Sequence, residues 1–308
     1  MKQFTIRLFN CLLVLLPVFA AAKDVPYSFA VAANAFRYGP DEQILSHTLS
    51  AASADTVSFI VANGVKADTE PCSDDLYLQR KAIYDKSKPG LVLSLGANDW
   101  AECMRSNGES AAIERLQRLR EMFFADAPSL ENGRIKVVQQ SASEKFRGYS
   151  ENLRWQKGPV VFATLNLPAN NNHYLSAAGR NSEFEDRLVA NQDWLNRLFV
   201  LAKTSKARGI VLFSEANPLA RPGVENSPDA PSRDGYAEIR RQLIKLSGEF
   251  QGKVLIVHNG KPSRWASLHK LSWRGNLGEL GMLTGWARIS VHPGRPTLFT
   301  ADLQTEEN

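Results

Sequence analysis

The side chains that could do chemistry lie in loops that follow predicted strands. In α/β folds the reactive groups usually sit at the C-terminal ends of strands. Here those ends hold residues 34–36, 63–64, 96–100, 166 with 170–172, and 258–260. These loops are rich in Asn and Gly and poor in charge. Metal-dependent hydrolysis needs Asp, Glu and His ligands, and nucleophilic catalysis needs an activated Ser or Cys. The loops therefore favour hydrogen bonding over either chemistry.

Common catalytic motifs are absent from the sequence. It has no H-E-x-x-H, no phosphate-binding G-x-x-x-x-G-K-S/T, no G-x-G-x-x-G and no G-x-S-x-G. The five histidines are scattered, and of these His258 alone falls at a predicted strand end. Imidazole titrates near neutrality, so His258 is a candidate acid–base group. A single His at such a place is more often structural or exposed.

Short apolar runs alternate with longer helical stretches along the chain. Strands are predicted at residues 27–33, 56–61, 91–95, 160–165, 209–213, 253–257, 286–291 and 297–300. Helices are predicted at residues 41–52, 73–86, 111–124, 183–203 and 236–250. Buried strands with helices between them indicate an α/β layered fold with no dividing linker. The proline-rich segment 217–234 is either a functional lid or a surface excursion.

The first 22 residues are typical of a cleavable signal peptide. Lys2 and Arg7 precede an apolar run over residues 8–22, which ends in the small residues Ala20, Ala21 and Ala22. A membrane anchor is the alternative, but the run is shorter than the ~20 apolar residues that span a bilayer. We therefore expect a signal peptide over residues 1–22 and one mature domain over residues 23–308. The mature protein would be periplasmic or secreted, with no membrane span.

The charge of the chain gives no sign of a nucleic-acid partner. The formal net charge is +5 over 308 residues, and loss of Lys2 and Arg7 lowers it by two to +3. The Lys and Arg residues are scattered along the sequence. Nucleic-acid binding requires a basic patch, so we expect no nucleic-acid partner.

Cysteine usage agrees with export. Cys11 lies inside the apolar run and leaves with the signal peptide, so Cys72 and Cys103 remain. An even pair in an oxidising compartment favours a disulfide. A pair of buried free thiols is the alternative.

Several blocks resemble an exported bacterial branch of the calcineurin-like metallophosphoesterases. The first two are Pro71-Cys72-Ser73-Asp74-Asp75-Leu76-Tyr77 and Leu95-Gly96-Ala97-Asn98-Asp99-Trp100-Ala101-Glu102-Cys103. The others are Glu151-Asn152-Leu153-Arg154-Trp155 and Phe162-Ala163-Thr164-Leu165 with the Asn170 to Asn172 run. The resemblance extends over roughly residues 29–299. It implies a four-layer α-β-β-α sandwich with two mixed sheets.

The resemblance also implies a two-metal centre whose ligands this chain has largely replaced. The family holds two metal ions on D-x-H, G-D, G-N-H-D/E, a further His and G-H-x-H, and a metal-bound hydroxide attacks a phosphate ester. Read in order, D-x-H becomes Asn34 and Phe36, and G-D becomes Asn63-Gly64. The third motif becomes Gly96-Ala97-Asn98-Asp99, Asn166 stands where the single His is expected, and the last motif becomes Asn259-Gly260-Lys261-Pro262.

These replacements remove most charged and imidazole ligands together. Neutral Asn or Gly cannot offset the desolvation of a divalent ion, and Lys261 would repel one. We therefore predict no metal site. Asn98, Asp99 and His258 are the candidate catalytic residues.

The first hypothesis is a catalytically degenerate family member that acts as a binding or scaffolding module. Its ligand-binding cleft would be floored by Asn34, Asn63, Asn98, Asp99, Asn166 and His258. Neutral amides suit hydrogen bonds to a small molecule, a glycan or a phosphate-containing ligand. Alternatively, these Asn residues only satisfy the backbone of loops and turns.

Two enzyme hypotheses are considered, of which the first remains open. One is a metal-dependent phosphoesterase that holds Mn, Fe or Zn on an unconventional set including Asp68, Asp99 and His258. The other follows from the likeness of Gly96 to Asp99 to the G-x-N-D block of G-D-S-L serine esterases, where the Asn donates to the oxyanion. Those enzymes need a Ser after the first strand and an Asp three residues before a late His. Here the first strand ends in Ala33-Asn34-Ala35 and Ile289 lies three residues before His292, so the nucleophile and the triad are both missing.

Overall fold

Two mixed β-sheets form the centre of the protein. The computed structural model describes residues 25–36, 39–54, 56–176, 180–220 and 233–304. The predicted signal peptide and most of the proline-rich segment lie outside these residues. Among them, no helix combines the length and the apolar character that crossing a membrane requires.

The smaller sheet has five strands in the order β12-β11-β1-β2-β3. Neighbours β1, β2 and β3 are parallel, whereas β11 and β12 are antiparallel to the strands beside them. The strands are β1 (Tyr27–Ala32), β2 (Ile60–Asn63), β3 (Leu91–Ser94), β11 (Trp286–Val291) and β12 (Phe299–Gln304).

The larger sheet has seven strands in the order β4-β5-β6-β7-β8-β10-β9. Its four central strands, β6, β7, β8 and β10, are parallel, and the outer pairings are antiparallel. The strands are β4 (Val137–Gln139), β5 (Leu153–Lys157), β6 (Val160–Thr164), β7 (Gly209–Ser214), β8 (Lys253–His258), β9 (Ser272–Arg274) and β10 (Leu277–Gly281). The prediction of an α/β protein with two mixed sheets is confirmed.

Aromatic side chains join the two sheets. Phe29 of β1 meets Phe162 of β6 edge to face, with ring centroids 5.2 Å apart. Phe59, just before β2, meets Trp155 at 5.4 Å and Phe162 at 5.1 Å. These four side chains are at most 2% exposed. Edge-to-face aromatic pairs contribute about 0.5–1.5 kcal/mol each beyond area burial, so this cluster fixes how the sheets face each other.

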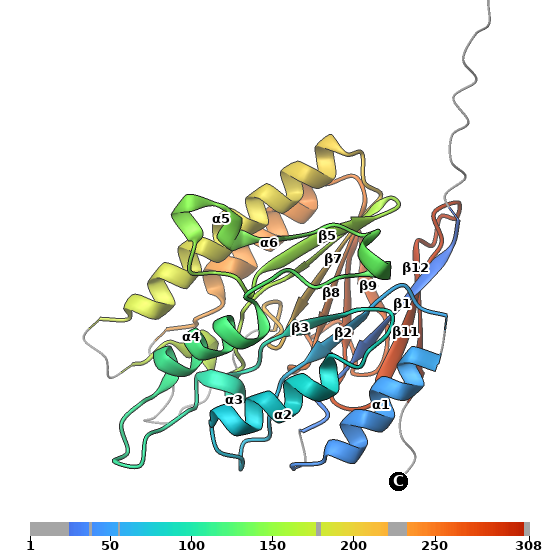
Figure 1. Cartoon of the computed structure of the whole chain (residues 1–308). Coiled ribbons are helices and arrows are strands. Elements are labelled where there is room, and N and C mark those ends of the chain that lie inside the picture. The colour runs from blue at the N-terminus through green and yellow to red at the C-terminus, as the bar shows by residue number, and fades with distance from the viewer. Residues whose placement is uncertain (1–24, 37–38, 55, 177–179, 221–232, 305–308) are drawn as a thin grey trace, which may run out of the picture.

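Helices cover the sheets on their other sides (Figure 1). Alternate residues of β6, β7 and β8 point to a second core formed with the apolar faces of α5 and α6. In Figure 1, α1 and α2 lie along the five-stranded sheet, on the side opposite to α5 and α6. The helices are α1 (Glu42–Ala54), α2 (Asp74–Tyr84), α3 (Ala97–Trp100), α4 (Ala112–Phe123), α5 (Ser182–Thr204) and α6 (Ala237–Gly248).

The structure departs from the predicted elements in short segments. The strand predicted at residues 56–61 begins later, at Ile60, where the ladder to β1 starts. Strands β4, β5, β9 and β10 were not predicted. Residues 96–100 were expected to be a loop, but α3 occupies Ala97–Trp100.

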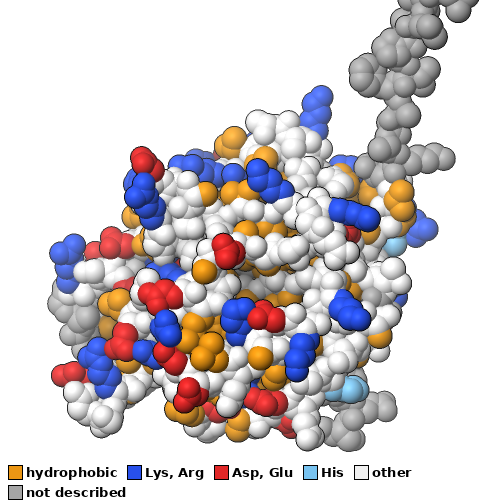
Figure 2. All heavy atoms as spheres, viewed as in Figure 1, with side chains coloured by type: hydrophobic (Ala, Val, Ile, Leu, Met, Phe, Trp, Pro, Cys, Tyr) orange, Lys and Arg blue, Asp and Glu red, His pale blue; other side chains and the backbone are white. Residues whose placement is uncertain are grey.

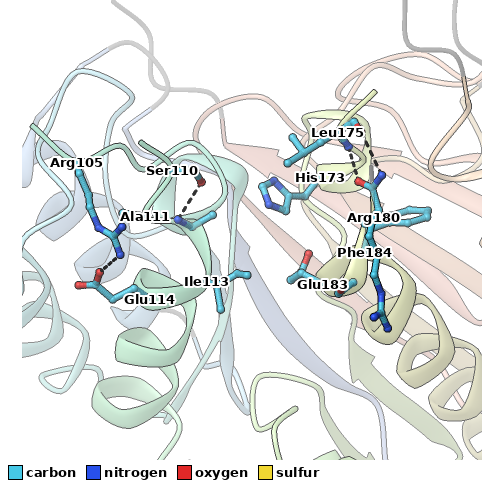
Figure 3. Close-up of a pocket in the computed structure, with 13 residues that line it drawn as sticks. Arg105, Ser110, Ala111, Ile113, Glu114, His173, Leu175, Arg180, Glu183 and Phe184 are labelled. Carbon is cyan, nitrogen blue, oxygen red and sulfur yellow. Dashed lines mark hydrogen bonds and ion pairs between the residues drawn. The ribbon is translucent and has the colours of Figure 1, made fainter. Parts of the chain in front are cut away.

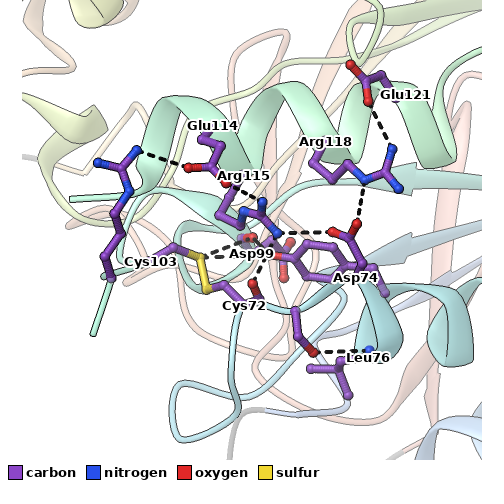
Figure 4. A network of polar contacts seen from close by, with 12 residues as sticks. Cys72, Asp74, Leu76, Asp99, Cys103, Glu114, Arg115, Arg118 and Glu121 are labelled. Carbon is purple, nitrogen blue, oxygen red and sulfur yellow. Dashed lines mark hydrogen bonds and ion pairs between the residues drawn. A yellow bond between two sulfur atoms is a disulfide. The ribbon is translucent and has the colours of Figure 1, made fainter. Parts of the chain in front are cut away.

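The predicted disulfide between Cys72 and Cys103 is confirmed. The two Cα atoms lie 5.9 Å apart. Cys72 precedes Ser73, whose hydroxyl caps α2, and Cys103 lies just beyond α3. Arg115 and Arg118 of α4 donate to Asp74 at 3.0 and 2.8 Å (Figure 4). The bond and the ion pairs therefore hold α2, α3 and α4 together.

Replacing both cysteines by Ser should lower the free energy of unfolding by about 3–4 kcal/mol, because the bond restrains a loop in the unfolded chain. The two cysteines are 31 residues apart in sequence. Urea unfolding at pH 7 would compare the double variant with the oxidised protein. The wild type with excess reductant is the control and should match the variant. Equal midpoints for all three samples would contradict this role.

Candidate functional site

Loops from both sheets meet where the parallel strands end. They bring together Asn34, Asn63, Gly64, Gly96, Asp99, Glu215 and Asn259, which we call the strand-end cluster. The Asn63 amide donates to Asn259, and thereby links the end of β2 with the residue after β8. Part of the edge at which sequence analysis placed the chemistry is therefore connected by direct contacts between the two sheets.

Glu215 is the central acid of the cluster. It follows β7, and its carboxyl oxygen Oε2 accepts the backbone N–H groups of Ala97 and Ala169, both at 2.7 Å. Glu215 is 8% exposed. Burial raises its pKa to about 8, and the charge of Asp99 contributes, although the two backbone hydrogen bonds oppose the shift. At neutral pH the carboxyl is therefore mostly protonated.

Asp99 binds backbone groups with both carboxylate oxygens. Oδ2 accepts from Gly96 N–H at 2.6 Å. Oδ1 accepts from Val65 N–H at 2.7 Å and from Lys66 N–H at 3.2 Å. Burial raises the pKa of Asp99 to about 6, against the effect of these hydrogen bonds and of the Lys66 charge. The side chain thus ties the loop after β2 to the start of α3.

The amides of the cluster also bind within the protein. Asn34 Oδ1 accepts the N–H of Phe36 at 2.9 Å. Gly64 has a φ of +79°, and a Cβ there would lie 3.2 Å from the Asn34 side chain. Asn63 Oδ1 and Asn259 Nδ2 are buried and find no partner among the described residues. In this amide pair, Asn63 Oδ1 and Asn259 Nδ2 can therefore each form a further hydrogen bond.

Two predicted cleft residues belong to other networks. His258 Nε2 lies 3.2 Å from Glu279 Oε1, and both side chains are fully buried. That oxygen also accepts from Ser263 N–H at 2.9 Å. Burial works to raise the pKa of Glu279, but the hydrogen bonds from His258 and Ser263 hold it below its ordinary value. Asn166 instead donates to Glu151 at 3.1 Å.

The remaining candidates lie around the rim of the cluster. Asn98 is half-buried, and its carbonyl accepts from Lys66 Nζ at 3.2 Å. Asp68 and Lys261 are exposed. Within the described ranges, no three His, Cys, Asp or Glu side chains gather closely enough to hold a metal ion.

Sequence reasoning missed Glu215. It directly follows a predicted strand that ends at residue 213, so the rule used for the other loops also pointed to it. No motif marks the residue, because its partners are backbone N–H groups of segments 46 and 118 residues away. Only the folded chain brings these groups together.

A separate cavity of about 380 Å³ lies between the starts of α4 and α5. His173, Arg105 and Arg180 line it together with Ala111 and Ser182. Figure 3 shows the His173 ring extending between the two helix starts. The ring of Trp100 lies 5.0 Å from that of His173, and Trp100 is fully buried. Trp100 therefore forms part of the wall behind His173.

No protein-family model matches the chain, and no curated protein matches it. The likeness to the metallophosphoesterases therefore depends on the residues and the arrangement described above.

Changing Glu215 to Gln should flatten the pH dependence of stability between pH 6.5 and 8. An acid whose folded pKa is raised, here to about 8, stabilises the fold at low pH, and this contribution is lost as pH rises toward the folded pKa. One proton changes the free energy of unfolding by about 1.4 kcal/mol per pH unit at most. Asp99, with a pKa of about 6, contributes little in this window.

Urea unfolding at pH 5, 6.5 and 8 would measure the effect. The matched control is Glu185→Gln, an exposed acid of α5, which should keep the wild-type slope. A Glu215→Gln protein with the same slope as the wild type would show that Glu215 is not protonated in the folded state.

Proposed function

We propose that this protein is a degenerate member of the calcineurin-like metallophosphoesterase superfamily that binds a ligand or a partner and does not hydrolyse. The proposal includes export to the periplasm or beyond and a four-layer α-β-β-α sandwich of that family's type. The two mixed sheets joined through an aromatic core, with helices on their other sides, support the fold. The resemblance of the quoted sequence blocks supports the family.

One observation carries the loss of hydrolysis: the Asp99 carboxylate is occupied by three backbone N–H groups. A metal ligand needs free lone pairs directed at the ion and a carboxylate that stays ionised. Asp99 uses its oxygens to hold the loop after β2 and the start of α3. It therefore serves the fold at the acidic position of the family's third motif, and Ala97 stands where that motif has its metal-binding Asn.

The position of Gly64 agrees with this. The family's second motif would place an Asp there, but the backbone has a φ of +79°. A side chain at such a φ is strained, and a Cβ would press on Asn34 at 3.2 Å. The conformation of this loop therefore disfavours an aspartate side chain at residue 64.

The alternative, a phosphoesterase with a metal held by Asp68, Asp99 and His258, is less well supported. His258 pairs with Glu279, whereas Asp68 is exposed and accepts the N–H of Thr69. The three side chains have separate partners. Neutral amides such as Asn63 and Asn259 instead suit hydrogen bonding to an uncharged or phosphate-bearing ligand.

Metal content and turnover test the proposal directly. The protein would be incubated with Mn²⁺, Fe²⁺ or Zn²⁺, desalted and analysed by mass spectrometry for metal. Turnover of p-nitrophenyl phosphate and bis(p-nitrophenyl) phosphate would be assayed in parallel. We expect no retained metal and no turnover, because the ligand positions are neutral or occupied.

Two metal ions per chain with turnover would overturn the proposal. Loss of that turnover in Asp99→Asn would then assign the site. Because Asp99→Asn removes backbone contacts and is expected to destabilise the fold, Asp68→Asn serves as a second variant at an exposed position. Turnover lost in Asp68→Asn would favour the unconventional metal set.

A further inference from the structure

Two helices begin at the same cavity without side-chain caps. The residue before α4 is Ala111, which has no capping group. The residue before α5 is Asn181, a good capping residue, but its amide exchanges two hydrogen bonds with Leu175 instead. The first N–H groups of a helix lack intrahelical partners, and the helix dipole makes this end favourable for anions. Ala112 N–H binds the Ser110 hydroxyl at 3.3 Å, and the other first N–H groups of these helices have no side-chain partner among the described residues.

His173 supplies an independent sign of a ligand. It is 6% exposed and lines the cavity, and its ring makes no hydrogen bond with a described residue; Nδ1 is closed off from the cavity, so Nε2 is the ring nitrogen that can meet a ligand. A buried polar atom without a partner costs about 1–3 kcal/mol. Burial lowers the pKa of His173, so the neutral ring carries one N–H donor at pH 7. Figure 3 shows the ring directed into the space between the helices.

The backbone holds His173 in this position at a conformational cost. Asn171, Asn172 and His173 have φ values of 52°, 57° and 54°, a region that residues other than Gly rarely adopt. Arg187 secures the turn through the Asn172 carbonyl at 2.8 Å. Asn172 also donates to Gly235 O at 3.0 Å. Groups outside the cavity thus fix the turn. The His173 ring remains available to a ligand inside the cavity.

The charged side chains at the cavity differ in whether they form ion pairs with other residues. Glu114 is paired with Arg105, and Glu183 with Arg187. Arg180 is exposed and makes no ion pair within the described part of the chain. The unused charge at the cavity is therefore positive, and it adds to the two helix starts.

We propose that this cavity binds a small organic molecule through an oxyanion, either a phosphate ester or a carboxylate. The oxyanion accepts from the free N–H groups at the starts of α4 and α5 and from the His173 ring, and Arg180 pairs with its charge. The volume of about 380 Å³ exceeds that of an inorganic anion and falls in the range of small-molecule sites, roughly 300–1,000 Å³. The inference deepens the proposed binding role, but it uses no residue of the strand-end cluster.

Titration with inorganic phosphate and with acetate tests the site. Binding would be followed through the ring resonances of His173 in the full chain by NMR, with each of the other four histidines replaced in turn to assign them. We expect a Kd of about 1–10 mM for the preferred anion, which is typical of a few hydrogen bonds from a fragment. Tighter binding of phosphate would identify phosphate esters, and tighter binding of acetate would identify carboxylates.

Two variants and a matched control decide the outcome. Arg180→Gln should weaken binding about three- to tenfold through loss of a charge-assisted contact. His173→Asn should weaken it at least as much, because Asn tolerates a positive φ but is too short to reach the anion. Arg274→Gln, an exposed arginine of β9, should bind as the wild type does.

Unchanged His173 resonances with both anions would overturn the site. Equal weakening in Arg274→Gln and Arg180→Gln would also overturn it, since the binding would then follow net charge. Either result would leave the proposed loss of hydrolysis intact. Turnover in the metal assay would overturn the proposed function without affecting this cavity.

Discussion

The arrangement at the strand ends depends on the carboxyl group of Glu215. It extends from β7 and accepts one N–H from Ala97, which begins α3 beside the five-stranded sheet, and one from Ala169, which follows β6. Buried backbone N–H groups need partners, and this single oxygen serves segments of both sheets. Ala169 leads into the turn that presents His173, and α3 carries Trp100, whose ring backs His173. The buried acid therefore holds the segments that precede His173 and Trp100 in the chain.

Such an arrangement restricts the neighbouring sequence. A Cβ on Gly96 would lie 2.8 Å from Glu215 Oε1, so a side chain at residue 96 would displace the Glu215 carboxyl group. Asp99 binds the N–H of the same glycine. Two acids thus lie close together, and ionising both without a cation is costly. Burial raises the pKa of Asp99 to about 6 and that of Glu215 to about 8, and the Asp99 charge adds to the second shift, so Glu215 carries a proton at neutral pH. In a two-metal enzyme, cations would relieve this cost.

The sequence predicted those parts of the fold that depend on continuous apolar runs. The buried strands β1, β3, β6, β7 and β8 and the long helices were predicted because their composition and periodicity are local properties. Strand β10 has the sequence LGELG, whose glycines and acid gave no strand signal. Helix α3 is a single turn that its own Asp99 caps through Gly96 N–H and that Glu215 holds from outside through Ala97 N–H. At the site, the strand-end rule located Asn34, Asn63 and Asp99, but it could not show that His258 pairs with Glu279. That partner lies 21 residues further along the chain.

The two places where a ligand could bind differ in which of their polar groups lack a hydrogen-bond partner. At the strand ends the backbone occupies Asp99 and one oxygen of Glu215, and Asn63 Oδ1 and Asn259 Nδ2 are buried atoms of the cluster without a partner among the described residues. Between α4 and α5 there is an unpartnered imidazole nitrogen, two uncapped helix starts and space for a small molecule. Unsatisfied polar groups are costly, and a ligand in this cavity would satisfy the N–H groups at the two helix starts. The cavity combines such groups with enough room for that ligand, which makes it the stronger binding site of the two.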